Sequence, residues 1–253
     1  MGIKASKRLL LFVNKWLQLL GIKLKKSSSV TRTWPEALQH IRDAGFFPEV
    51  IVDVGVLHGT YELYESFPES RYILFEALDV YEPSLKVIAS KFDATYHLVA
   101  AGKVAGEMPF SVRVNDPGSS SAAIISGEDN VDHISVPVAR IDEVLSEDDL
   151  GESAALKVDV EGFELDVIEG CGSLIHAFEF VILECRFFKY EPAMYEFSEV
   201  VSRMKALGFV VYDMLDGGYR PQDGVLDLVD LVFVREDGFL RNSISKHYRH
   251  DAS

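Results

Sequence analysis

Short apolar runs separated by helix-like segments are the feature that most constrains this chain. The run EVIVDVG at 49–55 is largely apolar and ends in Asp and Gly, as is typical of a strand buried on both faces of a parallel sheet. Similar runs follow at 71–77 and 95–101, and the segments at 59–66 and 80–92 predict helices between them. Strands that alternate with helices predict an α/β fold, a mostly parallel sheet with helices on both faces.

The middle of the chain interrupts this alternation. Strand-like runs at 107–114 and 134–141 flank a polar, Gly- and Ser-rich stretch at 115–130. We expect a long loop there, and long loops in compact domains are often functional. The alternation then resumes, with expected strands at 156–160, 180–185, 209–214 and 226–236 and helices at 163–175 and 195–207.

Composition limits the class of protein. The 253 residues are enough for one large α/β domain, which we place at 34–242, between an extension with a linker at 1–33 and a tail at 243–253. A net charge of −15 argues against nucleic acid as a partner, because phosphate binding needs a basic surface. Two cysteines, Cys171 and Cys185, are too few for a disulfide scaffold and lack zinc spacing. We expect a cytoplasmic protein.

The first 33 residues differ from the rest in charge. They hold eight basic residues and no acidic one, whereas the remainder holds 17 basic and 40 acidic residues. Residues 7–26 mix Lys with Leu, Phe, Val and Trp, and the longest apolar run, Leu9–Val13, has five residues, far below the roughly 20 that a membrane span needs. Three roles stay open: an amphipathic helix at the inner face of the membrane, a helix packed on the domain or on a partner subunit in a homo-oligomer, or disorder. The start MGIKAS also matches the pattern for myristoylation at Gly2, a short pattern that often matches by accident.

A cofactor site is predicted at the first strand. The stretch DVGVLHGT places Asp53, Gly55 and Gly59 directly after it. A strand, a glycine turn and a helix N-terminus form the cofactor crevice of open α/β sheets. Glu76 ends the next strand, 21 residues after Gly55, where its carboxylate can accept hydrogen bonds from both ribose hydroxyls of a nucleoside.

The turn itself favours one nucleoside cofactor. The dinucleotide fingerprint needs a glycine two residues after the first one, and Leu57 stands there. An acidic turn with Asp53 suits a cationic ligand better than a pyrophosphate. We therefore expect S-adenosylmethionine, which carries an ammonium and a sulfonium and no phosphate. An NAD-dependent sugar oxidoreductase is the alternative enzyme, and a turn that merely caps the strand is the alternative without a cofactor.

A second site is predicted in LKVDVEGFELDVIEG at 156–170. Its strand should lie beside the first strand, at the switch point where ligands bind. Lys157, Asp159 and Glu161 alternate, so in a regular strand that ends near 161–162 they share one face. Glu184 ends the run FVILEC and should reach the same edge of the sheet. The structural alternatives are ion pairs, Lys157 with Asp159 and Glu184 with Arg186. In the following helix we expect solvated or capping roles for Glu164, Asp166 and Glu169.

With these pieces the chain resembles the FkbM family of S-adenosylmethionine-dependent methyltransferases. The matching segments are IVDVGVLHGTYELYESFPESRYILFEA, VAAGKVAGEMPFSV, GSSSAAI, VPVARIDEVL, LKVDVEGFELDVIEG and FVILECRF, which cover 50–187 in the family's order. The resemblance implies a class I methyltransferase (Rossmann-like) fold, with a seven-stranded, mostly parallel sheet whose last strand is antiparallel. It also implies O-methylation of a hydroxyl of a sugar, a polysaccharide, a glycolipid or a small natural product. The chain departs from the family at VLHG, where Ala-Asn-x-Gly is common, and at Glu76-Ala77, where Glu-Pro is common.

The predicted site residues follow from the motifs and the resemblance together. Asp159 is the expected base or hydroxyl-orienting group, because burial and the neighbouring acids would raise its low pKa. Three alternatives stay open: a Mg²⁺ ion held by the carboxylates, His58 or His133 as the base, and an inactive methyltransferase-like binding subunit. No clean set of metal ligands is visible, so the predicted site has no metal. The predicted catalytic residues are Asp159, Glu161, Lys157 and Glu184, and the predicted cofactor-binding residues are Asp53, Gly55, His58, Gly59, Thr60, Glu76, Ala77, Ala101, Ser121 and Asp159.

Overall fold

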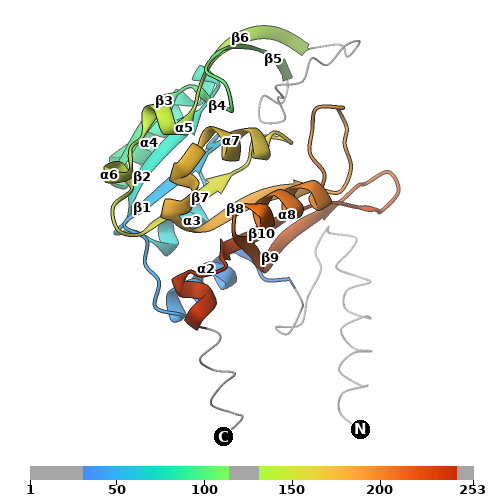
Figure 1. Cartoon of the computed structure of the whole chain (residues 1–253). Helices are drawn as coiled ribbons and strands as arrows, with labels where there is room; N and C mark the ends of the chain where they lie inside the picture. Colours follow the sequence, from blue (N-terminus) through green and yellow to red (C-terminus); the bar gives the residue numbers. More distant parts are fainter. Residues whose placement is uncertain (1–30, 114–130, 244–253) are drawn as a thin grey trace, which may run out of the picture. The chain divides into compact units, whose positions relative to one another are not determined.

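The computed structural model describes residues 31–113 and 131–243. In this part of the chain a seven-stranded sheet runs in the order β3-β2-β1-β7-β8-β10-β9 (Figure 1). The strands are β1 (Val50–Val54), β2 (Arg71–Glu76), β3 (Ala94–Leu98), β7 (Ala154–Val158), β8 (Phe178–Arg186), β9 (Phe209–Tyr219) and β10 (Leu226–Arg235).

Strand direction confirms the expected fold class. The pairs from β3 through β8 are all parallel, and β10 is antiparallel to both β8 and β9. The central strands β1 and β7 are buried along their whole length, which explains their continuous apolar sequences. The protein therefore has the class I methyltransferase fold, with the last strand inserted antiparallel.

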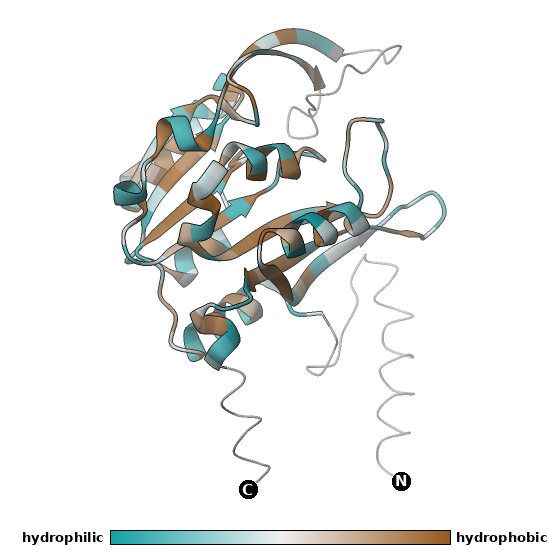
Figure 2. Ribbon diagram, in the orientation of Figure 1, coloured by the Kyte–Doolittle hydropathy of each residue, from teal (hydrophilic) through white to brown (hydrophobic). Residues whose placement is uncertain are grey.

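Helices cover both faces of this sheet, and the alternation of side chains along each strand builds two cores. In β1, Val52 packs into one core with α5 (Ile141–Val144), α7 (Glu164–Gly170), η4 (Gly172–Ala177) and α8 (Phe197–Ala206). Its neighbour Ile51 packs into the other core, with α2 (Trp34–Asp43), α3 (Tyr61–Ser66) and α4 (Glu82–Lys91). Figure 2 shows the hydrophobic residues concentrated along the strands between these layers. The described residues also contain two short elements, η2 (Asp79–Tyr81) and α6 (Glu147–Leu150), and a helical turn at 239–243.

A second, three-stranded sheet contains β4 (Ala100–Ala101), β5 (Gly106–Arg113) and β6 (Val131–Ala139), in the order β4-β6-β5. The single strand predicted at 95–101 is therefore wrong. Strand β3 pairs with β2 only as far as Leu98, and the next strand, β4, pairs with β6 instead. The strands predicted at 107–114 and 134–141 are confirmed as an antiparallel pair with shifted ends. The loop predicted at 115–130 lies outside the described residues.

Two predicted boundaries around the second motif need correction. The strand β7 ends at Val158, because Glu161 and Gly162 have φ angles of +59° and +98° and leave the extended conformation. The helix predicted at 163–175 divides into α7 and the 3₁₀ turn η4. Gly172, with φ of +53°, lies outside the α-helical region and causes that division.

The extension and the tail lie almost wholly outside the described residues, so their expected roles stay predictions. No helix within 31–113 or 131–243 combines the length and the apolar character that crossing a membrane requires.

Gly55 lets the end of β1 touch the loop after β7. Its φ is +77°, and a Cβ atom there would lie 1.8 Å from the carbonyl oxygen of Asp159. The amide of Asp159 also donates to the carbonyl of Val54 at 3.1 Å. The two predicted motifs are thus in backbone contact, and only glycine fits at the contact.

We expect Gly55→Ala to lower the free energy of unfolding by about 3 kcal/mol or more, because strain at positive φ adds to a clash with backbone that cannot move aside. Gly208→Ala is the matched control, since Gly208 has φ of +84° and no heavy atom within 4 Å of the added carbon, so that only about 1 kcal/mol of backbone strain is expected. Urea denaturation of both variants measures the difference. Equal losses would contradict the proposed steric contact.

Candidate functional site

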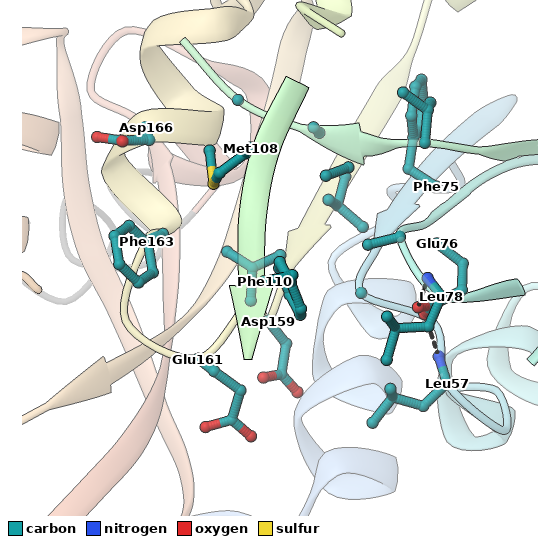
Figure 3. Close-up of a pocket in the computed structure, with 18 of the residues that line it drawn as sticks. Leu57, Phe75, Glu76, Leu78, Met108, Phe110, Asp159, Glu161, Phe163 and Asp166 are labelled. Atoms are coloured by element: carbon teal, nitrogen blue, oxygen red, sulfur yellow. Dashed lines mark hydrogen bonds between the residues drawn. The ribbon is translucent and has the colours of Figure 1, made fainter. Parts of the chain in front are cut away.

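A crevice opens at the carboxyl ends of β1, β2, β7 and β8, below the β4-β6-β5 sheet (Figure 3). It brings together the glycine turn, the acid that ends β2 and the loop after β7. It is lined by Val54, Gly55, Leu57, Phe75, Glu76, Ala77, Leu78, Val99, Ala100, Ala101, Gly102, Met108, Phe110, Asp159, Val160, Glu161, Phe163, Asp166 and Glu184.

Glu76 is fixed at the wall of this crevice. Its carboxylate accepts hydrogen bonds from the backbone amides of Leu57 and Leu78, both at 2.9 Å. The residue is only 3% exposed, and burial raises the pKa of Glu76 despite these bonds. A carboxylate has about four acceptor positions, so the Glu76 carboxylate can still accept from a hydroxyl group of a ligand.

Asp53 and Lys157 lie below the crevice and are absent from its lining. Asp53 is fully buried, accepts a hydrogen bond from the hydroxyl of Tyr64 at 2.5 Å, and lies 3.2 Å from Nζ of Lys157. Nζ of Lys157 also donates to the carbonyl of Gly55 at 2.8 Å. Burial lowers the pKa of Lys157, but the carboxylates of Asp53, Asp159 and Asp230 together outweigh this effect and raise it. Both side chains therefore support the Gly55 turn from beneath.

Three predicted carboxylates do meet in the crevice. Figure 3 shows Asp159 and Glu161 pointing the same way from the loop after β7. The side chain of Asp159 is 40% exposed, and its Oδ2 lies 3.8 Å from Nζ of Lys157. Glu184 reaches the same crevice from the end of β8.

Arg186 ties two of these acids together. Its guanidinium lies 3.1 Å from Oε2 of Glu184 and donates a hydrogen bond to Glu161. Burial, and next the charge of Asp159, raise the pKa of Glu184 to about 9. Burial therefore favours the protonated form of Glu184 near neutral pH.

The other predicted cofactor residues divide into two groups. Ala77 and Ala101 line the crevice. Gly59 and Thr60 stand just before α3 and are not among its lining residues. Ser121 lies outside the described residues.

Neither histidine that we considered as a base lines the crevice. His58 is exposed, with Nδ1 3.2 Å from the hydroxyl of Ser84. His133 is exposed on β6, with Nδ1 3.1 Å from the hydroxyl of Ser111. Over residues 31–113 and 131–243, no three or more His, Cys, Asp and Glu side chains form a group that could hold a metal ion.

Glu164 is a positioning residue that the sequence reasoning missed. It is only 2% exposed, and one oxygen of its carboxylate accepts from the amides of Val160 and Gly162 at 3.2 and 3.0 Å. Of the two roles expected, solvated or capping, Glu164 has the capping one, because its side chain folds back and caps the loop that carries Asp159. Burial raises the pKa of Glu164 to about 7. An acid two residues after a glycine, in the first turn of a helix, was the available signal.

Asp166 is also tied down. It lines the crevice, accepts from the hydroxyl of Tyr195 at 2.6 Å and pairs with Lys103 at 3.1 Å. The apolar wall formed by Met108 and Phe110 comes from β5, and nothing in the sequence around β5 marked these two residues as part of a site.

Glu164 should make stability depend on pH in a defined direction. Its pKa is higher in the folded protein than the ordinary 4.5, so its stabilising contribution is complete below pH 4.5 and is lost as pH rises through about 7. Glu164→Gln keeps an acceptor oxygen for both amides but cannot ionise. We expect the free energy of unfolding of the variant, relative to that of the wild type, to rise by about 3 kcal/mol between pH 4.5 and pH 8. Urea denaturation across that pH range measures it. A constant difference between the two proteins would refute this role.

Comparison with protein-family models identifies the family of this chain. The family model for the methyltransferase FkbM domain matches residues 53–211, more than half of the chain. No curated protein matches the sequence.

Many solved structures show similarity at low identity. One is the 1,6-didemethyltoxoflavin-N1-methyltransferase of Burkholderia thailandensis, with 14% identity, 80% of this chain and 77% of that chain covered, and a TM-score of 0.39. Another is the magnesium protoporphyrin IX methyltransferase of Synechocystis PCC 6803, with 10% identity, coverage of 80% and 77%, and a TM-score of 0.41. A third is the precorrin-6y C5,15-methyltransferase of Geobacter metallireducens, with 11% identity, coverage of 83% and 92%, and a TM-score of 0.41. By its match to the family model, the chain belongs to the FkbM family of S-adenosylmethionine-dependent methyltransferases.

Proposed function

We propose that the protein transfers the methyl group of S-adenosylmethionine to a hydroxyl of a sugar, a glycan, a glycolipid or a small natural product, with Asp159 as the base. The observation that carries this proposal is the position of the Asp159 carboxylate. It is partly exposed in the same crevice as Gly55 and Glu76, so a hydroxyl bound there can meet both the carboxylate and the cofactor.

The crevice fits the cofactor by charge and shape. Its lining contains five acidic side chains and, among the described residues, no Lys or Arg. That environment favours the ammonium and sulfonium of S-adenosylmethionine over the pyrophosphate of a dinucleotide, which makes the oxidoreductase alternative weaker. Leu57, Leu78 and Phe110 offer apolar contacts for the adenine ring, and Glu76 has acceptor positions left for the ribose hydroxyls.

The residues around Asp159 suit the removal of a hydroxyl proton. Bound S-adenosylmethionine supplies a methyl group on a positively charged sulfur, so that alignment provides much of the rate. Asp159 accepts the proton of the acceptor hydroxyl or orients that hydroxyl. Lys157, at 3.8 Å, stabilises the charged carboxylate, and Glu164 holds the loop that presents it. Proton transfer to a positioned group contributes about 10²- to 10⁴-fold in rate.

Cofactor binding tests the first half of the proposal. We expect calorimetry to give micromolar affinity for S-adenosylmethionine and S-adenosylhomocysteine and no binding of NAD⁺. Glu76→Ala should weaken both affinities at least tenfold, because charged hydrogen bonds are worth about 1.5–3 kcal/mol each. Glu236→Ala is the matched control, since Glu236 is exposed and pairs with Lys205 far from the crevice lining. Preference for NAD⁺ would reject the cofactor assignment.

Turnover tests the second half. Asp159→Asn should lower kcat for methyl transfer to a panel of sugars by about 100-fold or more, and the Kd for S-adenosylhomocysteine, measured on the same samples, separates this loss from any weaker cofactor binding. Asp237→Asn is the control, because Asp237 is an exposed partner of Arg235. Release of S-adenosylhomocysteine measures turnover. Full activity of Asp159→Asn would remove Asp159 as the base, and cofactor binding without any turnover would favour the inactive binding subunit.

A further inference from the structure

A second groove lies at the same edge of the sheet. Strand β8 ends at Arg186, and the antiparallel β10 begins beside it, with Leu228 opposite Arg186. The segment 187–196 after β8 and the turn 220–225 between β9 and β10 therefore meet at the carboxyl end of β8 (Figure 1). The groove is lined by Tyr190, Arg220, Pro221, Gln222, Asp223 and Asp227.

The charges of this groove are compensated within it. Arg220 pairs with Asp223, and its guanidinium lies 4.5 Å from the ring centroid of Phe188. Asp227 accepts a hydrogen bond from the hydroxyl of Tyr190. No guanidinium in this lining lacks a carboxylate, so a phosphate or carboxylate ligand gains little here. Each carboxylate also has a donor already, so a cationic amine gains little as well.

What remains is the chemistry that binds a neutral sugar. Tyr190 is 48% exposed and offers a flat apolar ring face. The carboxylates of Asp223 and Asp227 keep further acceptor positions, and the amide of Gln222 adds both a donor and an acceptor. Hydroxyl groups of a sugar need that mixture, and its apolar C–H face packs on an aromatic ring.

Arg186 connects the groove to the crevice. One of its guanidinium nitrogens lies 4.0 Å from Asp227 and another 3.1 Å from Glu184, and its Cζ lies 5.9 Å from the ring centroid of Tyr190. Glu184 lines the crevice and Asp227 lines the groove. Arg186 lines neither cavity, but it contacts lining residues of both, so a ligand of more than one sugar ring that spans this side chain would reach the crevice and the groove.

We infer that this groove binds a neutral sugar ring of the acceptor, next to the ring whose hydroxyl lies at Asp159. The inference rests on the proposed sugar methyltransferase function and extends it. Acceptor selection then depends on Tyr190 and Gln222, which take no part in binding the cofactor.

Saturation-transfer NMR on the full chain, with and without S-adenosylhomocysteine, tests this inference. The probes are neutral methyl glycosides of glucose, galactose, mannose and rhamnose, the neutral oligomers maltotriose and cellotriose, anionic glucose 6-phosphate and cationic glucosamine. We expect binding of at least one neutral probe. Tyr190→Ala and Gln222→Ala should each weaken it tenfold or more, and Tyr219→Ala should change it less than twofold. Tyr219 is the matched control, because it is 66% exposed near the same turn but outside the groove lining.

The inference is overturned if no neutral probe binds, if the charged probes bind more tightly, or if Tyr190→Ala and Gln222→Ala bind the neutral probe as the wild type does. Calorimetry with S-adenosylhomocysteine on the same samples separates this result from the proposed function. Cofactor binding without sugar binding rejects the groove alone, whereas sugar binding without cofactor binding rejects the cofactor crevice alone.

Discussion

The buried pair of Lys157 and Asp53 is the interaction on which the site depends. Both side chains are almost wholly removed from water, and removing one member of such a pair leaves an uncompensated charge at a cost of about 3–5 kcal/mol. The lysine also donates to the carbonyl of Gly55. It therefore joins the end of β1 to the end of β7 at the point where Gly55 touches Asp159. The glycine turn after β1 and the loop after β7 are therefore coupled to each other.

The same pair keeps the charges of the site apart. Lys157 neutralises Asp53 below the crevice, while Arg186 holds Glu161 and Glu184 on the other side of Asp159. Because Glu184 is mostly protonated near neutral pH, the charge next to Asp159 is smaller than the number of acids suggests. Asp159 remains partly exposed, with Nζ of Lys157 3.8 Å from its carboxylate.

The sequence predicted the parts of the fold and site that local pattern controls. Apolar runs located the strands of the parallel sheet, and the switch point followed from their order. Asp53 shows what the sequence alone could not predict. The sequence placed it correctly at the end of β1 but could not tell that a tyrosine eleven residues later and a lysine on a neighbouring strand would enclose it. Met108 and Phe110 reach the crevice from another sheet, and that contact depends on tertiary packing that no local pattern encodes.

In the function that we propose, topology gives the cofactor and the acceptor separate places. On one side of β7, the strands β1 and β2 end in the glycine turn and Glu76, and both are parallel to it. On the other side, the antiparallel β10 brings a turn and a second groove to the edge where β8 ends. A purely parallel sheet would place the beginning of that strand at the opposite edge. Because of the reversed strand, the sequence of the turn at 220–225 can change without altering the backbone contacts at Gly55. A change of acceptor in this fold therefore need not disturb the proposed cofactor crevice.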